Sequence, residues 1–434
     1  MTEFVFPQNR NLSGVDNFFL AMEHSVQEIS GRSNICRIVI DLPEKVKLPD
    51  FKKKCQDAAL IVWLTSLRVS PGFPFQIPQW YCYRGDEEVC VVEHVTDELI
   101  PQELLTQRIN VFKKPLIRFD LLQRSSGKST IIFSWSHVLM DAHGAETLLK
   151  HFSDCVKVEN KEDFFPSDQV STEKFIDKLN RSKVIKNYLN DKELSPFVNV
   201  IEDKKQFKSS VVYKNMVFSE DETKLIDANS SRSPAKFLKS LFFLSAVTRA
   251  YDELLKVKKI PRGNFLVPVP QDGRKRGSKA PVISNAVNFL FFKIPQKVMV
   301  DRDSTIEELV HQMKEMMKIE LQKKYSDFMD ICRRLPLFIY NKILNSASEG
   351  NMASFIFSDT GNSLNDFNEF MGQEVQRIFH YPPNTCPPGF TIVFSRHKNA
   401  LNVTLSYMKD MMAEGEVDIF ENQLRKDLLT QSPQ

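Results

Sequence analysis

The sequence lacks long hydrophobic runs. Its longest apolar patches, at residues 241–247 and 289–292, are far shorter than the roughly 20 residues that a membrane-spanning helix needs. We expect no apolar leader, since Glu3 and the polar residues 9–11 interrupt any such run near the start. Charge of one sign is not in excess, because 58 Lys and Arg stand against 55 Asp and Glu, a formal net charge of +3. We therefore expect a soluble protein that binds no nucleic acid and contacts a membrane at most peripherally.

Paired cysteines are absent as well. The seven cysteines are odd in number, form no Cys-x-x-Cys pair and are scattered along the chain, which argues against a disulfide framework. Reduced thiols in a cytoplasmic protein are the expected state. The cysteines are Cys36, Cys55, Cys82, Cys90, Cys155, Cys332 and Cys386.

The 434 residues suit two domains of about 200 residues each. The hydrophobic fraction of 42% and the charged fraction of 26% are those of an ordinary folded protein. Phenylalanine is abundant, with 34 residues against only 14 glycines, and we expect most of it in the core. Such a supply of rings can also line a channel for an acyl chain.

Helical and alternating patterns are interleaved, so the predicted class is α+β. From residue 157 to 208 charges dominate and strand signal is poor, which indicates a connector. We expect an N-terminal domain at 1–200, including most of that connector, and a C-terminal domain at 201–434. Expected helices are 13–23, 48–62, 221–228, 236–255, 305–325 and 417–428; expected strands are 36–40, 79–83, 89–92, 116–122, 130–136, 211–213, 265–270, 286–294, 355–357, 389–394 and 401–405.

The most informative stretch lies at residues 134–144, between an alternating run at 130–133 and a helix start at 146–150. It places His137 at the end of a strand and Asp141 four positions later in a turn. Imidazole titrates near neutrality, so a histidine fixed in this way can take a proton from a hydroxyl or amine and return it to a leaving group. An incidental histidine and aspartate in a loop are the alternative.

The sequence around this stretch resembles the chloramphenicol acetyltransferase-like acyltransferases, which include peptide-synthetase condensation domains and wax ester synthase/diacylglycerol acyltransferases. Their His-His-x-x-x-Asp-Gly signature stands here as Ser136 to Ala142, with serine for the first histidine and alanine for the glycine. Further similar segments follow in the family's order: Leu12-Ser13-Gly14-Val15-Asp16, Leu67-Arg68, Pro268 to Arg274, Asn288 to Pro295, and Ser358-Asp359-Thr360-Gly361-Asn362.

The resemblance implies two chloramphenicol acetyltransferase-like α/β sandwich domains, with mixed sheets and flanking helices, in a V around a central tunnel. It makes His137 the general base and gives Asp141 a structural role, paired with Arg68 as the first choice or Arg274 as the second. Asn288, Ser358 and Ser136 become candidates for binding the oxyanion or the substrate. Ala142 is expected to tighten the turn, because a side chain resists positive φ, with relief from Gly144.

No resident cofactor and no metal are expected, because His137, Asp141 and His143 have no third ligand at close spacing. His143 is interpreted as a loop or helix-start side chain. Cys332, beside two arginines, is either an activated thiol or a plain helical cysteine. Residues 325–344 form either an interfacial helix or buried packing interrupted at Pro336.

Three functions follow from these patterns. The first is a monomeric acyltransferase that moves a medium or long acyl chain from a thioester, acyl-CoA, to a hydroxyl or amine of a small molecule or lipid, in lipid or secondary metabolism. The second is a free-standing condensation enzyme that uses donors on an acyl carrier protein, docked by basic residues at 113–114 and 274–276. The third is a non-catalytic relative that binds an acyl chain or a partner protein.

Overall fold

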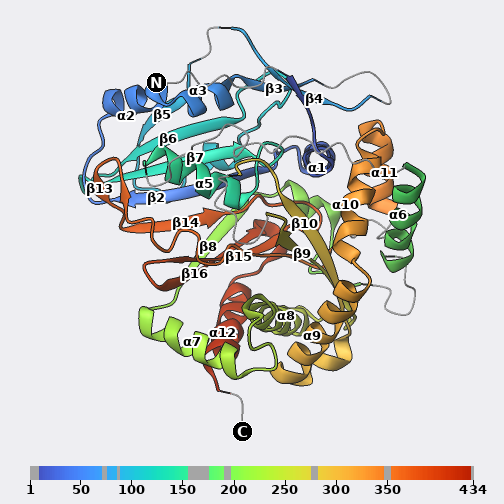
Figure 1. Cartoon of the computed structure of the whole chain (residues 1–434). Coiled ribbons are helices and arrows are strands. Elements are labelled where there is room, and N and C mark those ends of the chain that lie inside the picture. The colour runs from blue at the N-terminus through green and yellow to red at the C-terminus, as the bar shows by residue number, and fades with distance from the viewer. Residues whose placement is uncertain are drawn as a thin grey trace.

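The computed structural model describes residues 9–70, 76–85, 88–154, 175–189, 197–274, 282–346 and 353–431. Two lobes, each a sheet with flanking helices, lie one above the other (Figure 1). The N-terminal part of the chain contributes β1 (Asn9–Asn11), α1 (Gly14–Ser30), β2 (Ile35–Leu42), α2 (Leu48–Asp57), α3 (Ala59–Ser66), β3 (Leu67–Ser70), β4 (Gln79–Cys82), β5 (Val91–Val95), α4 (Gln102–Leu105), β6 (Ile117–Gln123), β7 (Ser129–Ser136) and α5 (Ala142–Phe152).

The remainder of the chain forms most of the second lobe and a helical flank beside it. Its elements are α6 (Phe175–Leu189), β8 (Val211–Val217), α7 (Glu220–Arg232), α8 (Lys239–Val257), β9 (Phe265–Asp272), β10 (Val287–Ile294), α9 (Arg302–Lys318), α10 (Leu321–Cys332), α11 (Leu337–Ser346), β11 (Ile356–Asp359), β12 (Glu369–Phe370), β13 (Gln373–Glu374), β14 (Arg377–Tyr381), β15 (Phe390–His397), β16 (Ala400–Met408) and α12 (Glu416–Leu429).

The first lobe is built on a five-stranded sheet in the order β14-β2-β7-β6-β5. Its central strand β7 is buried along its whole length, including its serine and threonine residues. Aromatic side chains fill the core under α2 and α5, and the Phe119 and Phe133 rings stack with centroids 4.9 Å apart. A separate three-stranded sheet, β1-β4-β3, lies beside it.

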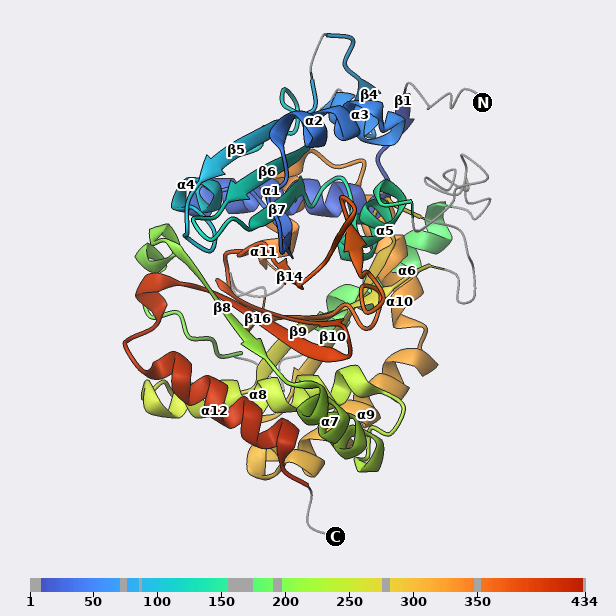
Figure 2. The same ribbon diagram turned by 90° about the vertical axis from the view of Figure 1, so that its left-hand side faces the viewer.

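The edge strand β14 comes from the far end of the sequence and pairs antiparallel with β2, from Arg377 opposite Asp41 to Tyr381 opposite Arg37. Figure 2 shows this strand between the two lobes. The first lobe is therefore completed by C-terminal residues, which the expected division at residue 200 did not include. Hydrophobic periodicity along one segment carries no information on which distant strand it joins.

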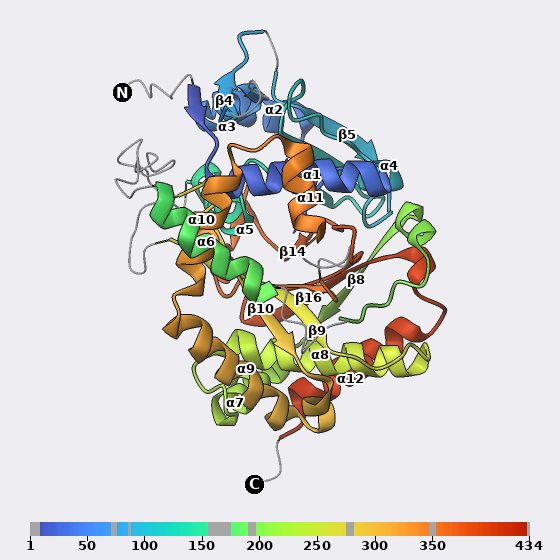
Figure 3. The same cartoon turned by 90° about the vertical axis from the view of Figure 1, so that its right-hand side faces the viewer.

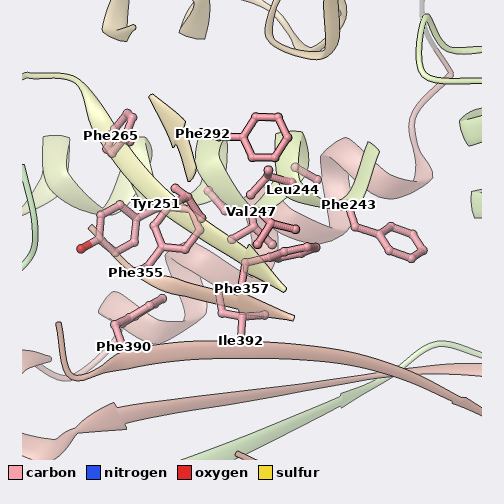
Figure 4. Close-up of a cluster of buried hydrophobic side chains, with 14 of the residues drawn as sticks. Phe243, Leu244, Val247, Tyr251, Phe265, Phe292, Phe355, Phe357, Phe390 and Ile392 are labelled. Carbon is pink, nitrogen blue, oxygen red and sulfur yellow. The ribbon is translucent and has the colours of Figure 1, made fainter. Parts of the chain in front are cut away.

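The second lobe contains the four-stranded sheet β11-β15-β16-β8 and the hairpin of β9 and β10, covered by α7, α8, α9 and α12. Figure 4 shows its core, in which the Tyr251 ring packs against Phe265, Phe355 and Phe390. The high phenylalanine content is thus largely core, as expected. The two-lobed α+β architecture with flanking helices is confirmed.

Two expected helices differ from those observed, and the expected connector contains a helix. The helix expected at 48–62 is divided at Ala58, and the one at 305–325 ends at Lys318, where Glu320 takes a left-handed φ of 50° before α10. The connector contains α6, which packs against α10, whereas residues 155–174 and 190–196 lie outside the described part. Figure 3 shows α10 and α11 beside α1, with α6 against α10.

The segment at 325–344 is packed rather than interfacial, because α10 and α11 both lie against α1. Cys332 at the end of α10 is 2% exposed, and burial raises the pKa of its thiol to about 12. The thiol is therefore protonated at neutral pH, which excludes an activated thiolate. Across the described ranges, no helix is long and apolar enough to cross a bilayer.

Candidate active site at the seam between the lobes

His137 lies in the turn that joins β7 to α5, at the level where the two lobes meet. Its backbone N–H donates to the Asn34 carbonyl at 3.0 Å, which extends the β2–β7 pairing by one residue. From the other lobe, the Asn285 side-chain amide donates to the carbonyls of His137 and Val138 at 3.2 and 2.9 Å. The backbone on both sides of the ring is thereby held by the two lobes.

The His137 ring faces a cavity of about 650 Å³ that residues of both lobes line. Its Nδ1 is buried and has no hydrogen-bond partner among the described residues, so Nε2 is the nitrogen that can meet a ligand. Phe19 of α1 stacks on the ring, with centroids 3.7 Å apart and planes 18° from parallel. Burial lowers the pKa of His137 to about 4, although the Asp141 charge opposes the shift. The imidazole is therefore neutral at physiological pH and can accept a proton.

Asp141 caps the N-terminus of α5, since its Oδ1 accepts the Gly144 N–H at 2.8 Å. The same carboxylate receives the Arg274 guanidinium in a bidentate pair, Nη2 to Oδ1 at 2.8 Å and Nη1 to Oδ2 at 3.1 Å. Oδ2 also accepts the Ala286 N–H at 2.8 Å. Asp141 thus joins the histidine turn to the β9–β10 hairpin, and Arg274, the second choice, is its partner.

The prediction that Arg68 pairs with Asp141 is wrong. Arg68 begins on β3 in the three-stranded sheet, and its Nη1 donates to the carbonyls of Thr65 and Leu67, both at 2.7 Å. Its guanidinium lies 5.5 Å from the centre of the Tyr83 ring. Arg68 therefore stabilises the end of α3 and the start of β3, while both oxygens of Asp141 are occupied by the other lobe.

Of the three oxyanion candidates, only Ser358 lines the cavity, from β11. Asn288 is wrong as a cavity residue, because its neighbours Val287 and Phe289 on β10 face the cavity and side chains alternate along a strand. Ser136 is wrong for a similar reason, since Trp135 and His137 line the cavity and Ser136, 1% exposed, does not.

One wall of the cavity is a continuous row of aromatic rings that begins at the catalytic candidate. The Phe19 ring on His137 lies 6.2 Å from Phe289, which is 6.4 Å from Phe291, and Phe291 stacks on Tyr325 at 4.9 Å. These rings come from α1, β10 and α10, so the row crosses from one lobe to the helical flank. Such a wall can contact an extended apolar chain whose reactive end lies at His137.

His143 occupies the first turn of α5, as expected, and it also lines the cavity. Its Nδ1 lies 2.7 Å from Oε2 of the buried Glu146, and His380 Nε2 lies 2.7 Å from the other oxygen of that carboxylate. Burial alone would lower the pKa of His143, but Glu146 raises it to about 9. The described residues contain no group of three or more His, Cys, Asp and Glu side chains suited to a metal.

The glycine that the turn requires is Gly144, not the residue at 142. Ala142 opens α5 and is not among the described residues with positive φ, so the expected tightening is wrong. A Cβ on Gly144 would lie 1.8 Å from the Ile283 carbonyl oxygen, because the backbone preceding β10 crosses there. The close approach of the two lobes, rather than φ, demands glycine.

We expect Gly144→Ala to lower the free energy of unfolding by about 1–3 kcal/mol or more, because the added methyl must displace the backbone at residue 283. Chemical denaturation monitored by circular dichroism measures this change. Ala142→Gly, two residues earlier in the same turn, is the matched control and should cost less than about 1 kcal/mol. Equal stability of the Gly144 variant and the native protein would contradict the close approach.

Two positioning residues were missed in the sequence. Asp16 of α1 is 2% exposed, and its Oδ1 accepts the Asn285 side-chain amide at 3.0 Å, so it orients the amide that holds the His137 turn. Burial raises the pKa of Asp16, although four hydrogen-bond and charge contacts oppose the shift. Asp16 could have been found from the sequence, because it lies in the segment 12–16 that resembles the family. Asn285 lies in no motif and could not have been found in this way.

No protein-family model matches this sequence, and no curated protein matches it significantly. Solved structures do match along almost its whole length. The first condensation domain of the CDA synthetase aligns with a TM-score of 0.67 and 11% identity, covering 97% of this chain and 96% of that one. The TRI3 trichothecene 15-O-acetyltransferase from Fusarium sporotrichioides aligns at 0.67 and 14%, covering 97% and 95%.

The starter condensation domain of rhizomide synthetase RzmA, a variant solved in complex with C8-CoA and Leu-SNAC, aligns with a TM-score of 0.61 and 11% identity. It covers 97% of this chain and 94% of that one. Identities this low establish likeness of fold. The chain thus has the two-lobed fold of these condensation domains and of the acetyltransferase.

Proposed function

We propose that the protein is an acyltransferase that moves a medium or long acyl chain from a thioester, acyl-CoA, to a hydroxyl or amine acceptor, with His137 as general base. One observation carries the proposal: a neutral imidazole faces the cavity between the lobes at the start of an aromatic wall. The fold supports it, because its structural neighbours include a named acetyltransferase and several condensation domains.

In the proposed reaction, Nε2 of His137 takes the proton of the acceptor O–H or N–H while that oxygen or nitrogen attacks the thioester carbonyl carbon. The tetrahedral intermediate then collapses, the C–S bond breaks, and the thiolate receives the proton from the imidazolium. The products are the acylated acceptor and a free thiol. Ser358, at the cavity surface, is the remaining candidate donor for the oxyanion.

Asp141 takes no proton in this scheme. Its two oxygens accept four hydrogen bonds, two from Arg274 and one each from the backbone N–H groups of Gly144 and Ala286. Its role is to hold the turn at which His137 stands. The scheme uses the thioester as co-substrate and needs no other cofactor and no metal, and we propose that a cytoplasmic monomer carries it out.

The test is a direct assay of the full chain with acyl-CoA donors from C2 to C16 and a mixture of alcohols and amines. Thiol release and mass spectrometry of the products report transfer. We expect release to depend on an acceptor and to favour chains of C8 or longer. If no donor releases thiol beyond hydrolysis in buffer, the proposed function is wrong.

A second candidate is a free-standing condensation enzyme that takes its donor from an acyl carrier protein. It is favoured by the whole-length likeness to condensation domains and by the exposed Lys113 and Lys114, which can meet an acidic carrier. The second basic cluster expected to dock a carrier is residues 274–276, and its Lys275 and Arg276 lie outside the described residues. The same acyl group offered on CoA and on a carrier protein, in parallel reactions, separates the two donors. Tight binding of acyl chains without any transfer would instead indicate the non-catalytic relative.

The pH dependence of His137 gives an independent prediction. Because its pKa is about 4 in the folded protein and about 6.5 when unfolded, the unfolded chain binds more protons between these values. Stability contributed by this group is therefore complete above about pH 6.5 and is lost as the pH falls towards 4. NMR titration of the ring signal, assigned with His137→Ala, should give a midpoint near 4. A midpoint near 6.5 would show that the ring is not desolvated.

A further inference from the structure

Arg37 is a charged side chain at the cavity that the mechanism above does not use. It lies on β2, next to the strand that carries His137, and is only 3% exposed although its side chain lines the cavity. In the sheet, Arg37 is paired in register with Tyr381 of β14 on one side and with Ser134 of β7 on the other. A guanidinium this deeply buried normally has a carboxylate beside it.

No described carboxylate forms an ion pair with Arg37. Its Nη2 donates to the Leu104 carbonyl, whereas its Nε is buried without a hydrogen-bond partner among the described residues. Asp120 contributes attraction from a distance, but that carboxylate already pairs with Arg118 Nε and His94 Nε2, both at 2.9 Å. The charge on Arg37 is therefore not neutralised by a direct partner.

Polar groups of the second lobe interact with this arginine or line the same cavity, and one of them lacks a hydrogen-bond partner among the described residues. Tyr213, whose phenol interacts with Arg37, donates its hydroxyl proton to the Pro382 carbonyl at 2.7 Å. Thr391 on β15 is 3% exposed, lines the cavity, and has a buried hydroxyl without a partner. Asn34 and Thr385 are further polar residues that line the same cavity. A ligand with negatively charged oxygens can satisfy these donors together.

We propose that Arg37 forms a carboxylate-binding subsite in the inter-lobe cavity, so that one substrate of this protein is an organic acid. A single guanidinium matches the single charge of a carboxylate, whereas a phosphate monoester carries close to two charges. The planar fork of arginine suits the two oxygens of a carboxylate. Under the proposed function, on which this assignment of a substrate rests, the acid is the acceptor and its hydroxyl or amine reaches His137.

The experiment measures binding, not transfer, with probes of one chain length. Sodium decanoate, 1-decanol and decyl phosphate are titrated into the full-length protein at pH 7.5 by isothermal calorimetry. We expect decanoate to bind about 10- to 100-fold more tightly than decanol, the range typical of a hydrogen bond to a charged group. Equal affinities of decanoate and decanol, or tighter binding of decyl phosphate than of decanoate, would overturn the proposal.

Variants locate the effect. Arg37→Met keeps the length of the side chain, removes its charge and should abolish the preference for decanoate, while Arg37→Lys should retain part of it. Arg377→Met is the matched control, because it removes the same charge from the neighbouring strand β14 at a side chain 66% exposed. If Arg37 only supports the Leu104 carbonyl, Arg37→Met will lower the melting temperature and leave the decanoate preference unchanged, which also overturns the proposal.

The outcome is separate from that of the proposed function. Decanoate selectivity that depends on Arg37 stands even if no thioester is turned over, and the wild-type comparison alone remains decisive if Arg37→Met fails to fold. Conversely, acyl transfer without any preference for decanoate would support the proposed acyltransferase function and contradict the carboxylate-binding subsite.

Discussion

Replacing His137 by alanine is expected to lower the rate of acyl transfer by about 10²–10⁴-fold, because the acceptor then loses the group that removes its proton. The Nδ1 of the ring has no hydrogen-bond partner among the described residues, so the fold should survive its removal. Steady-state kinetics with acyl-CoA and the best acceptor measure the effect on kcat. Circular dichroism and the melting temperature confirm that the variant is folded.

The matched control is His311→Ala, which removes an exposed histidine from α9 and should leave transfer unchanged. Rescue of the His137 variant by added imidazole would support proton transfer as the lost step. Full activity of a folded His137→Ala protein would refute the base assignment. It would leave the fold and the cavity in place and favour a binding role.

Breaking the pair of Asp141 and Arg274 is expected to give the largest loss of stability. Arg274→Met leaves the Asp141 carboxylate, 9% exposed, without its bidentate partner, and removal of one partner of a buried pair typically costs about 3–5 kcal/mol. Arg274 also donates two hydrogen bonds to the Val282 carbonyl and one to the Ser284 carbonyl. The variant therefore loses three further hydrogen bonds to the segment between β9 and β10. Transfer should fall together with stability.

A double-mutant cycle assigns the partner. Asp141→Asn combined with Arg274→Met should lose less stability than the sum of the single changes, because both remove the same interaction. Asp141→Asn combined with Arg68→Met should be additive, since Arg68 binds the carbonyls of Thr65 and Leu67 instead. Denaturant unfolding measures all five variants. Coupling of Asp141 to Arg68 rather than Arg274 would contradict the observed geometry.

Local patterns were sufficient to predict the elements around the site. The alternating run before His137 forms β7, and the small residues after Asp141 open α5 with that aspartate as its cap. The family resemblance misplaced Asn288 and Ser136, because one position along a strand turns a side chain to the other face. The local patterns also divided the chain near residue 200, whereas β14 crosses back to the first sheet.

The sequence by itself determined the α+β class, the strand–turn–helix unit and the position of His137 in that turn, since each depends on residues a few positions apart. Only the tertiary structure decided that Arg274 rather than Arg68 meets Asp141, that Asp16 and Asn285 hold the turn, and that Arg37 enters the cavity without a carboxylate. These contacts join residues more than a hundred positions apart. They arise from how the lobes pack, which no local periodicity encodes.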